Sequence, residues 1–349
     1  ALQEKYGGWA DRRVVDAFEA FVRVCFERFG DRIHKFLTIN EPDMLLMYGG
    51  HGLDFTGEEE FIKNRLIINH HFALAHAKAV NLCHEMLPDA LIGPVFGYVP
   101  VYPESSAPLN AIAAENISDI QNSFFQELFL NGIYMKNVLD YFERKSDAPL
   151  IRDGDMDLLK SAKSDIIALN YYKSDVARWC PEDTQERAMR GNEGGRKGSI
   201  VYPKVPGLYE LCANRHLERT DWDWEIDPAG IRYMLRKVYY RYHLPILITE
   251  NGMANFEHSD GEMIQDDYRI DYMQKHLSEC KKAVAEGVEL MGYCSWSFID
   301  LLSTSHGFQK RYGLVYVDRD DESERTLKRI PKKSYYWYQK TISNKGKDL

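Results

Sequence analysis

Five short apolar segments alternate with amphipathic helical segments along this chain of 349 residues. Few polar residues interrupt the apolar segments, which indicates strands that are covered on both faces, as in a parallel sheet flanked by helices. Repeated strand–helix units of this kind predict an α/β fold, either an open doubly wound sheet or a (β/α) barrel. The predicted strands are 35–39, 90–98, 165–170, 245–249 and 288–296.

Helical periodicity fills most of the sequence between and beyond these strands. The predicted helices are 11–29, about 58–86, about 107–145, 228–242, 265–286 and about 331–343. A long polar stretch, 181–224, interrupts the alternation. Its Gly-rich part, 191–198, neither follows a strand nor opens a helix, so it predicts a mobile surface loop and no phosphate-binding loop. No internal repeat or linker is evident, and we therefore expect one domain over 1–349.

Composition excludes several classes of partner. The 53 acidic and 44 basic residues give a formal net charge of -9 without a basic block, so nucleic acid is not expected to bind. No apolar run reaches the roughly 18 residues of a membrane span, and the polar start of the sequence lacks the features of a signal peptide. The cysteines are scattered without a CxxC pair, which indicates reduced thiols and a cytoplasmic protein. They are Cys25, Cys83, Cys180, Cys212, Cys280 and Cys294.

Two of the predicted strands have a glutamate at their carboxyl end. Glu250 follows the strand at 245–249, and Glu41 follows the strand at 35–39, where Pro42 prevents its continuation. A single carboxylate at such a position can be only a helix cap or a turn residue. In a barrel, however, the carboxyl ends of different strands meet at one mouth, and a pair of carboxylates there suits glycoside hydrolysis. The sequence pattern leaves open which of the two is the acid.

Four ordered motifs resemble those of glycoside hydrolase family 1, the retaining β-glycosidases with a (β/α)8 barrel. They are LTINEP at 37–42, ALNYY at 168–172, ITENGM at 248–253, and WSFIDLLS with KRYGLVYVD within 296–318. Further similarities, YGGW near the start, DWEIDPAGI and KKSYYWYQK, extend the resemblance over essentially the whole chain. The resemblance implies a single domain that is an incomplete TIM barrel, with about five of the eight parallel strands.

The same resemblance implies roles for residues at the strand ends. Glu41 would be the general acid/base and Glu250 the nucleophile that forms the glycosyl-enzyme. Asn40 would donate a hydrogen bond to the sugar 2-hydroxyl, and Asn170 would belong to the same substrate-binding set.

Two aromatic residues would complete this part of the site. Tyr172 would hydrogen-bond Glu250 and keep it ionised, and Trp296 would offer the sugar an apolar face. The alternative for both aromatic residues is simple core packing near a strand end.

Other residues suggest that the sugar carries a phosphate. Where family members that act on neutral glucosides have a glutamate followed by a tryptophan, this sequence has Ser303 and Thr304. A carboxylate would repel a phosphate, whereas a hydroxyl can donate to it. Downstream, the segment FQKRYG reads as a strand whose alternation places Lys310 and Tyr312 on one face and Arg311 on the other. The alternative is that Lys310 and Arg311 are solvated edge charges.

Ser303, Lys310 and Tyr312 match the phosphate-binding set of the family's 6-phospho-glycosidase branch, and Thr304 resembles the phospho-glucosidases more than the phospho-galactosidases. The expected substrate is therefore a 6-phospho-β-glucoside, such as phosphorylated cellobiose or an aryl glucoside, with a 6-phospho-β-galactoside as the alternative. Such substrates arise during sugar import, in agreement with a cytoplasmic enzyme. The resemblance implies no metal and no organic cofactor.

Compared with the family, the sequence begins after the third barrel strand, so a Gln and a His that hold the sugar and an Arg beside the nucleophile have no counterpart here. The chain would be a truncated product, one half of a pair with a complementing N-terminal fragment, or a remnant that binds phospho-sugars without catalysis. An unclosed barrel leaves two strand edges unpaired. We therefore expect weak or no turnover by this chain alone, and a homo-oligomer or a complementing fragment that covers the edges.

Overall fold

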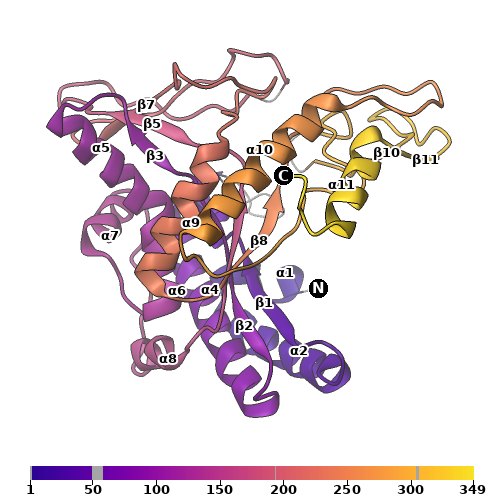
Figure 1. Ribbon diagram of the computed structural model, residues 1–349. Helices are drawn as coiled ribbons and strands as arrows, with labels where there is room; N and C mark the ends of the chain where they lie inside the picture. The colour runs from indigo at the N-terminus through magenta and orange to yellow at the C-terminus, as the bar shows by residue number, and fades with distance from the viewer. Residues whose placement is uncertain (1, 49–57, 193, 304–305) are drawn as a thin grey trace. The chain divides into compact units, whose positions relative to one another are not determined.

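The computed structural model describes residues 2–48, 58–192, 194–303 and 306–349 (Figure 1). The contacts along the chain divide it into two compact units. Unit 1 comprises Ala1–Tyr98 and Asp119–Leu169, and unit 2 comprises Val99–Ser118 and Asn170–Leu349. That the whole chain is one domain stays a prediction.

One sheet contains the five predicted strands, in the order β1-β2-β4-β8-β9. Strand β1 runs parallel to β2, and β8 runs parallel to β9. The predicted α/β fold with a five-stranded parallel sheet is thereby confirmed. The strand bounds are Lys35–Asn40, Leu91–Gly97, Ile167–Tyr171, Ile246–Asn251 and Leu290–Tyr293.

Unit 1 packs its helices around the long helix α4, which is followed by β2. The middle of α4 is rich in alanine, and its small side chains at Ala73, Ala75 and Ala77 are fully buried, which permits close approach of neighbouring elements. The helices of this unit are α1 (Leu2–Tyr6), η1 (Gly8–Ala10), α2 (Arg13–Phe29), α3 (Pro42–Tyr48), α4 (Glu58–Met86), the π-helical turn η2 (Asp119–Ser123), α6 (Phe124–Asn131), α7 (Lys136–Glu143) and α8 (Asp155–Ser161).

Buried polar groups tie α4 to its neighbours. His70 lies between the Tyr134 hydroxyl, 2.9 Å from Nδ1, and the Asp155 carboxylate, 3.0 Å from Nε2. Asp155 also forms a bidentate pair with Arg12 at the start of α2. These hydrogen bonds satisfy polar groups that would otherwise be costly to bury, so we assign His70 and its partners a structural role.

Unit 2 carries β8 and β9 together with α9 (Pro228–Tyr242), α10 (Asp267–Ala285) and α11 (Lys333–Ser343). Asp227 caps α9, because its side chain accepts a hydrogen bond from the Gly230 N–H at 2.9 Å. Helix α5 (Pro108–Ser118) and the hairpin of β10 (Val315–Val317) with β11 (Arg329–Pro331) also belong to this unit.

Unit 2 also contains a second, small sheet that the sequence did not predict. Its order is β3-β5-β7-β6, with bounds Val101–Pro103, Asp175–Arg178, Tyr209–Cys212 and Lys204–Val205. Two of these strands lie inside the polar stretch. They were missed because strands of two to four residues are too short to show a periodic pattern.

One local prediction changes. The segment FQKRYG is no regular strand: only Arg311 forms a bridge, with Asn255. In the Gly-rich segment, the Asp223 carboxylate accepts hydrogen bonds from the Gly198 N–H and from the Asn192 amide, and the mobility of the segment stays a prediction. Among the helices that the structure describes, none is at once long and apolar enough to cross a membrane.

Candidate active site

Glu250 occupies the carboxyl end of β8, and both of its neighbours in the chain are locked in place. On one side, the Thr249 hydroxyl donates to the Asn170 side-chain oxygen at 2.6 Å. On the other side, the Asn251 amide donates to the Tyr171 carbonyl at 2.7 Å. The side chains of Thr249 and Asn251 therefore bind the end of β8 to the end of β4, and they hold the backbone of Glu250 in place.

The Glu250 carboxyl is half-buried and receives two hydrogen bonds. The Tyr172 hydroxyl donates to Oε2 at 2.5 Å, and the Asn170 amide is a second partner. Burial, which disfavours the charged form, raises the pKa of Glu250, and the bonds from Tyr172 and Asn170 partly reverse this rise. The structure thus contains the contact between Tyr172 and Glu250 that the family resemblance implies, while the catalytic roles stay predictions.

Removing the Tyr172 hydroxyl should raise the pKa of Glu250 further. In Tyr172→Phe the carboxylate loses a donor that favours its charged form, so Glu250 should hold its proton to a higher pH than in the wild type. NMR titration of side-chain 13C-labelled glutamate measures this directly. Tyr233→Phe, on the exposed surface of α9, is the matched control and should leave the titration of Glu250 unchanged. A Glu250 titration that is the same in Tyr172→Phe would show that the hydrogen bond does not control the carboxyl.

Trp296 lies directly beside the end of β8. Its backbone N–H donates to the Asn251 carbonyl at 2.9 Å, and the peptide bond from Trp296 to Ser297 is cis. Its carbonyl oxygen approaches Gly252 so closely that a Cβ there would lie at 1.8 Å from it. The glycine of the ENG sequence is therefore needed for this contact.

An aromatic cluster surrounds Tyr172. Trp222 and Tyr312 are buried, and Tyr172, Trp224 and Trp296 pack against them. The Tyr172 ring lies 5.5 Å from the ring of Trp224 and 6.3 Å from that of Tyr312. The alternative of plain core packing therefore describes part of what Tyr172 and Trp296 do, but Tyr172 also reaches a carboxylate.

Lys310 ends in the same cluster. It is only 2% exposed, and its ammonium lies 4.0, 5.2 and 5.5 Å from the ring centres of Trp224, Trp222 and Tyr312. Within the part of the chain that the structure describes, no acidic side chain pairs with it. Burial lowers the pKa of Lys310 to about 7. A buried ammonium that contacts three aromatic rings and, among the described residues, pairs with no carboxylate is suited to accept an anion.

Arg311 points the other way, as the alternation of the sequence predicts. It is 4% exposed and pairs with Asp300 at 3.1 Å. Both basic residues are thus buried, and the alternative of solvated edge charges is wrong for both. The reason is that neither lies on an edge strand: the segment passes through the interior of unit 2.

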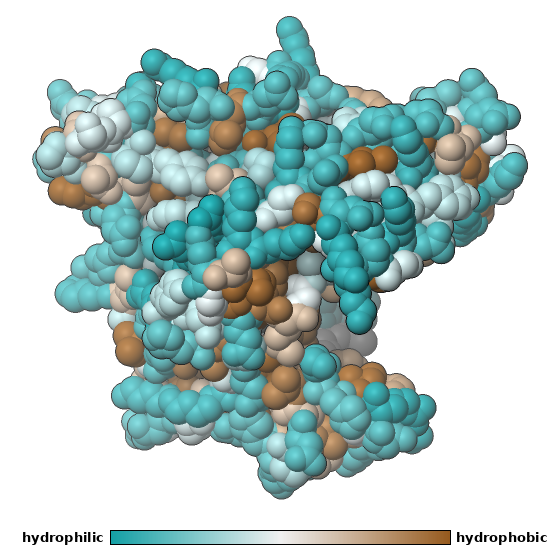
Figure 2. Space-filling view, viewed as in Figure 1, coloured by the Kyte–Doolittle hydropathy of each residue, from teal (hydrophilic) through white to brown (hydrophobic). Residues whose placement is uncertain are grey.

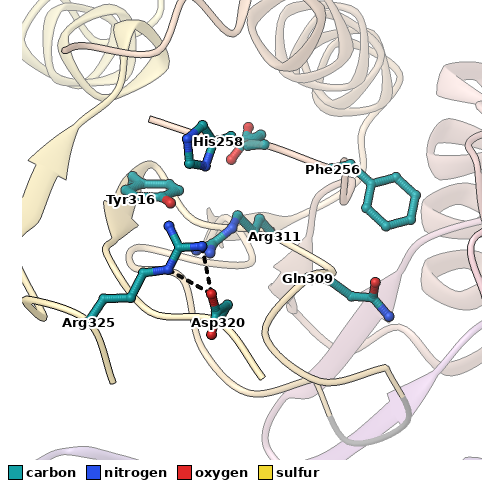
Figure 3. A pocket seen from close by; sticks show the side chains of 8 residues that line it. Phe256, His258, Gln309, Arg311, Tyr316, Asp320 and Arg325 are labelled. Atoms are coloured by element: carbon teal, nitrogen blue, oxygen red, sulfur yellow. Dashed lines mark hydrogen bonds and ion pairs between the residues drawn. The ribbon is translucent and has the colours of Figure 1, made fainter. Parts of the chain in front are cut away.

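A pocket of about 300 Å³ opens on the side of Arg311 (Figure 3). Arg325 pairs there with Asp320, and none of the residues predicted for the site lines the pocket. The charges of its two arginines are balanced by carboxylates, so the pocket offers no unpaired cation to a phosphate. Its lining residues are Phe256, Glu257, His258, Gln309, Arg311, Tyr316, Asp320 and Arg325.

Ser303 forms an antiparallel bridge with Gly307, and its N–H donates to the Gly307 carbonyl at 3.0 Å. His306, next to Gly307, has its ring 6.2 Å from the ring of Trp222, so this residue adjoins the aromatic cluster. A contact between the Ser303 hydroxyl and Lys310 stays a prediction. Thr304, on which the expected preference for glucosides depends, lies outside the described residues.

A buried ionic network lies behind the segment that carries Lys310. Lys332 pairs with Asp300 at 3.0 Å and also with Glu257. Arg269 pairs with Glu257 at 2.6 Å and donates to the Tyr312 carbonyl at 3.1 Å. The network thereby fixes the backbone at Tyr312, next to the residues that form the cluster.

Glu41 belongs to unit 1 and lies at the carboxyl end of β1. Its N–H donates to the Val95 carbonyl at 2.9 Å, and its φ of 48° is in the left-handed region that residues other than glycine seldom adopt. Strained backbone of this kind is concentrated at functional sites. Asn40 is paired in register with Val95 at the end of the same strand. Because Glu41 and Glu250 belong to different units, their meeting stays a prediction.

Three residues that lie next to predicted site residues were not identified from the sequence. Trp222 and Trp224 contact Lys310, and Asp43 is buried beside Glu41. Burial, with a smaller contribution from the charge of Glu41, raises the pKa of Asp43 well above its usual range. The sequence signal that could have identified Trp222 and Trp224 is their spacing in DWDWE, which places both rings on one side of an extended segment.

Comparison with known proteins gives the family. The model of glycosyl hydrolase family 1 matches residues 1–347. The aryl-phospho-β-D-glucosidase BglC of Bacillus subtilis is 41% identical over 100% of this chain and 73% of its own length. The 6-phospho-β-glucosidase of Dickeya chrysanthemi is 36% identical, with 100% and 71% covered.

A solved structure of a family 1 β-glucosidase from Thermotoga maritima matches with a TM-score of 0.82 and 33% identity. The match covers 99% of this chain and 71% of that one. It confirms the predicted fold class, part of the family's (β/α)8 barrel. The chain belongs to glycosyl hydrolase family 1.

Proposed function

We propose that this chain carries the catalytic carboxylates of a retaining β-glycosidase that hydrolyses 6-phospho-β-glucosides. The observation that carries the proposal is Lys310, a buried ammonium next to the residues around Glu250 and without an acidic partner among the described residues. Membership of the family supports glycoside hydrolysis. The names of its relatives, aryl-phospho-β-D-glucosidase and 6-phospho-β-glucosidase, support a phosphorylated glucoside.

In the proposed reaction, Glu250 attacks the anomeric carbon while Glu41 donates its proton to the leaving oxygen. The product is a glycosyl ester on Glu250. Glu41, now ionised, then removes a proton from water, which attacks the anomeric carbon and releases Glu250. The nucleophile has to be ionised, and the bonds from Tyr172 and Asn170 favour that state. The position of both glutamates at strand ends supports their meeting at one mouth.

The phosphate would bind at Lys310, Tyr312 and Ser303. A phosphate monoester carries about 1.5 to 2 negative charges at pH 7, and its charge would compensate the buried ammonium of Lys310.

Comparing two substrates tests the proposed function. Turnover by the purified chain alone is expected to be weak, and it should be faster with p-nitrophenyl 6-phospho-β-glucoside than with the unphosphorylated glucoside. Equal or faster hydrolysis of the plain glucoside would contradict phosphate recognition. Binding of the phosphorylated compound in a calorimeter without turnover would instead identify a phospho-sugar-binding remnant.

Lys310→Met should reduce kcat/KM for the phosphorylated substrate by about 10- to 100-fold, the range expected when a hydrogen bond to a charged group is lost. The value for the unphosphorylated glucoside should stay the same, because that sugar offers no anion to Lys310. Lys275→Met, an exposed substitution on α10, is the control. An equal loss with both substrates would show that Lys310 supports only the fold.

The phosphate affinity should depend on pH through Lys310. With a pKa of about 7, Lys310 carries a proton below that pH and loses it above. The affinity for a phosphorylated ligand should therefore fall as the pH rises from 7 to 9, although the phosphate itself stays a dianion there. Isothermal titration across this range measures the effect. An affinity that stays constant from pH 7 to 9 would contradict a buried, titrating lysine at the phosphate.

The proposal includes a partner for unit 1. Among the residues that the structure describes, strand β1 pairs only with β2. Large apolar side chains are exposed on α2, at Phe21, Val24 and Phe29, and on β1 at Leu37. Patches of hydrophobic surface accordingly interrupt the hydrophilic one over α2 (Figure 2). We expect a second copy or a complementing N-terminal fragment to cover this edge, in the cytoplasm, where sugars phosphorylated on import are found. Light scattering of the purified chain distinguishes an oligomer from a monomer.

A further inference from the structure

A continuous line of contacts joins the proposed phosphate site to the nucleophile inside unit 2. The Lys310 ammonium lies 4.0 Å from the ring centre of Trp224, and the Trp224 ring lies 5.5 Å from that of Tyr172. The Tyr172 hydroxyl then donates to Glu250 at 2.5 Å. Each step is a direct contact, and Trp224 lies between the cation and the tyrosine. Tyr312 offers a second, longer route, because its ring lies 5.5 Å from the ammonium and 6.3 Å from the ring of Tyr172.

The backbone of Trp224 is well anchored, so its ring is a suitable intermediate. Its N–H donates to the Thr220 hydroxyl at 3.2 Å, and its carbonyl accepts from the Thr220 N–H at 2.9 Å. The next residue, Glu225, is buried, and burial raises its pKa to about 7. The shift of the Lys310 pKa comes from burial. With the backbone fixed, the freedom that remains to Trp224 is that of its ring.

The protonation state of Lys310 determines how strongly it attracts the indole ring of Trp224. A charged ammonium is attracted to the face of an indole, whereas a neutral amine is not. Burial lowers the pKa of Lys310 to about 7, so near neutral pH the empty site contains both forms. Among the residues that the structure describes, the rings of Trp222, Trp224 and Tyr312 lie close to the Lys310 ammonium. An entering phosphate would keep the lysine charged.

We propose that Trp224 is a positioning residue that couples the anion site at Lys310 to the nucleophile, so that a bound phosphate fixes Tyr172 in its hydrogen bond to Glu250. The inference rests on the proposed function and extends it: the phosphate would favour the reactive state of Glu250 as well as substrate binding. Binding energy from a part of the substrate remote from the reacting bond would thus be used to raise kcat.

Inorganic phosphate is the probe that tests this coupling without requiring turnover. Glutamate 13C NMR follows the titration of Glu250 with and without saturating phosphate, at constant ionic strength set with chloride. We expect phosphate to lower the pKa of Glu250, because a better fixed Tyr172 favours the carboxylate. The charge of the phosphate acting directly would raise it, so the sign separates the two effects.

The variants assign the effect to Trp224. Trp224→Leu should lose the response of Glu250 while still binding phosphate within about threefold of the wild type, and Trp224→Phe, which keeps a ring, should retain most of it. Trp222→Phe alters the other indole beside Lys310 and should leave the response intact. If Trp224→Leu does not fold, Tyr172→Phe breaks the last link and should abolish the response in the same way.

The outcomes separate the coupling from the function on which it rests. Phosphate binding that requires Lys310, together with an unchanged or raised pKa of Glu250, or with equal responses in the wild type and in Trp224→Leu, would overturn the coupling and leave the phosphate site in place. Binding that is absent, or that is the same in Lys310→Met, would overturn the proposed phosphate recognition and the coupling together.

Discussion

Glu250→Gln should reduce the rate of hydrolysis of a 6-phospho-β-glucoside by about 10⁴-fold or more, the size of effect seen when a catalytic nucleophile is removed. The amide keeps the shape of the side chain and can still contact Tyr172, but it cannot form the glycosyl ester. A substrate with a good leaving group, 2,4-dinitrophenyl 6-phospho-β-glucoside, makes slow turnover measurable. Mass spectrometry of the quenched wild-type reaction should show the glycosyl group on the peptide that contains Glu250.

Glu289→Gln is the control, because this glutamate is exposed just before β9 and has no place in the proposed reaction. Its rate should be unchanged. If Glu250→Gln retains hydrolysis within tenfold of the wild type, Glu250 is not the nucleophile.

Lys332→Met should lower the free energy of unfolding by about 3 to 5 kcal/mol, the usual cost of leaving a buried charge without its partner. Lys332 is completely buried and contacts both Glu257 and Asp300. Without its ammonium, two buried carboxylates lose a shared counter-charge. Urea denaturation measures the change as a lower transition midpoint.

Lys333→Met is the matched control, one residue along the chain. Lys333 is exposed and pairs with Asp267 on the surface, so its loss should change the stability by less than about 1 kcal/mol. If the two variants are equally stable, the buried network does not hold the segment behind the cluster. If Lys332→Met is destabilised as expected, Lys310 and Tyr312 depend on that network for their position.

The large elements were predictable because each shows a strong periodic signal. The helix predicted over 58–86 is α4, with bounds Glu58–Met86, and the strand at 35–39 is β1, one residue longer. Apolar runs such as PILIT mark strands that are covered on both faces. The small sheet was missed because its strands contain few residues and are stabilised by pairing between distant segments, for example between β3 and β5.

The candidate site was predictable where the sequence carries a motif. Resemblance supplied the pairing of Tyr172 with Glu250, and alternation placed Lys310 and Arg311 on opposite sides even though the segment forms no regular strand. The position of Trp224 between Lys310 and Tyr172 could not be predicted, because no local pattern shows which rings meet in the folded chain.

The separation of the Glu41 and Glu250 carboxyl groups tests the proposed mechanism most directly. A crystal structure of the chain with a bound 6-phospho-β-glucoside analogue would give this distance. We expect about 5 to 5.5 Å, with the sugar between the two groups, since that spacing accompanies retention. Carboxyl groups that face apart, or lie farther apart than about 9.5 Å, would contradict a shared role in hydrolysis.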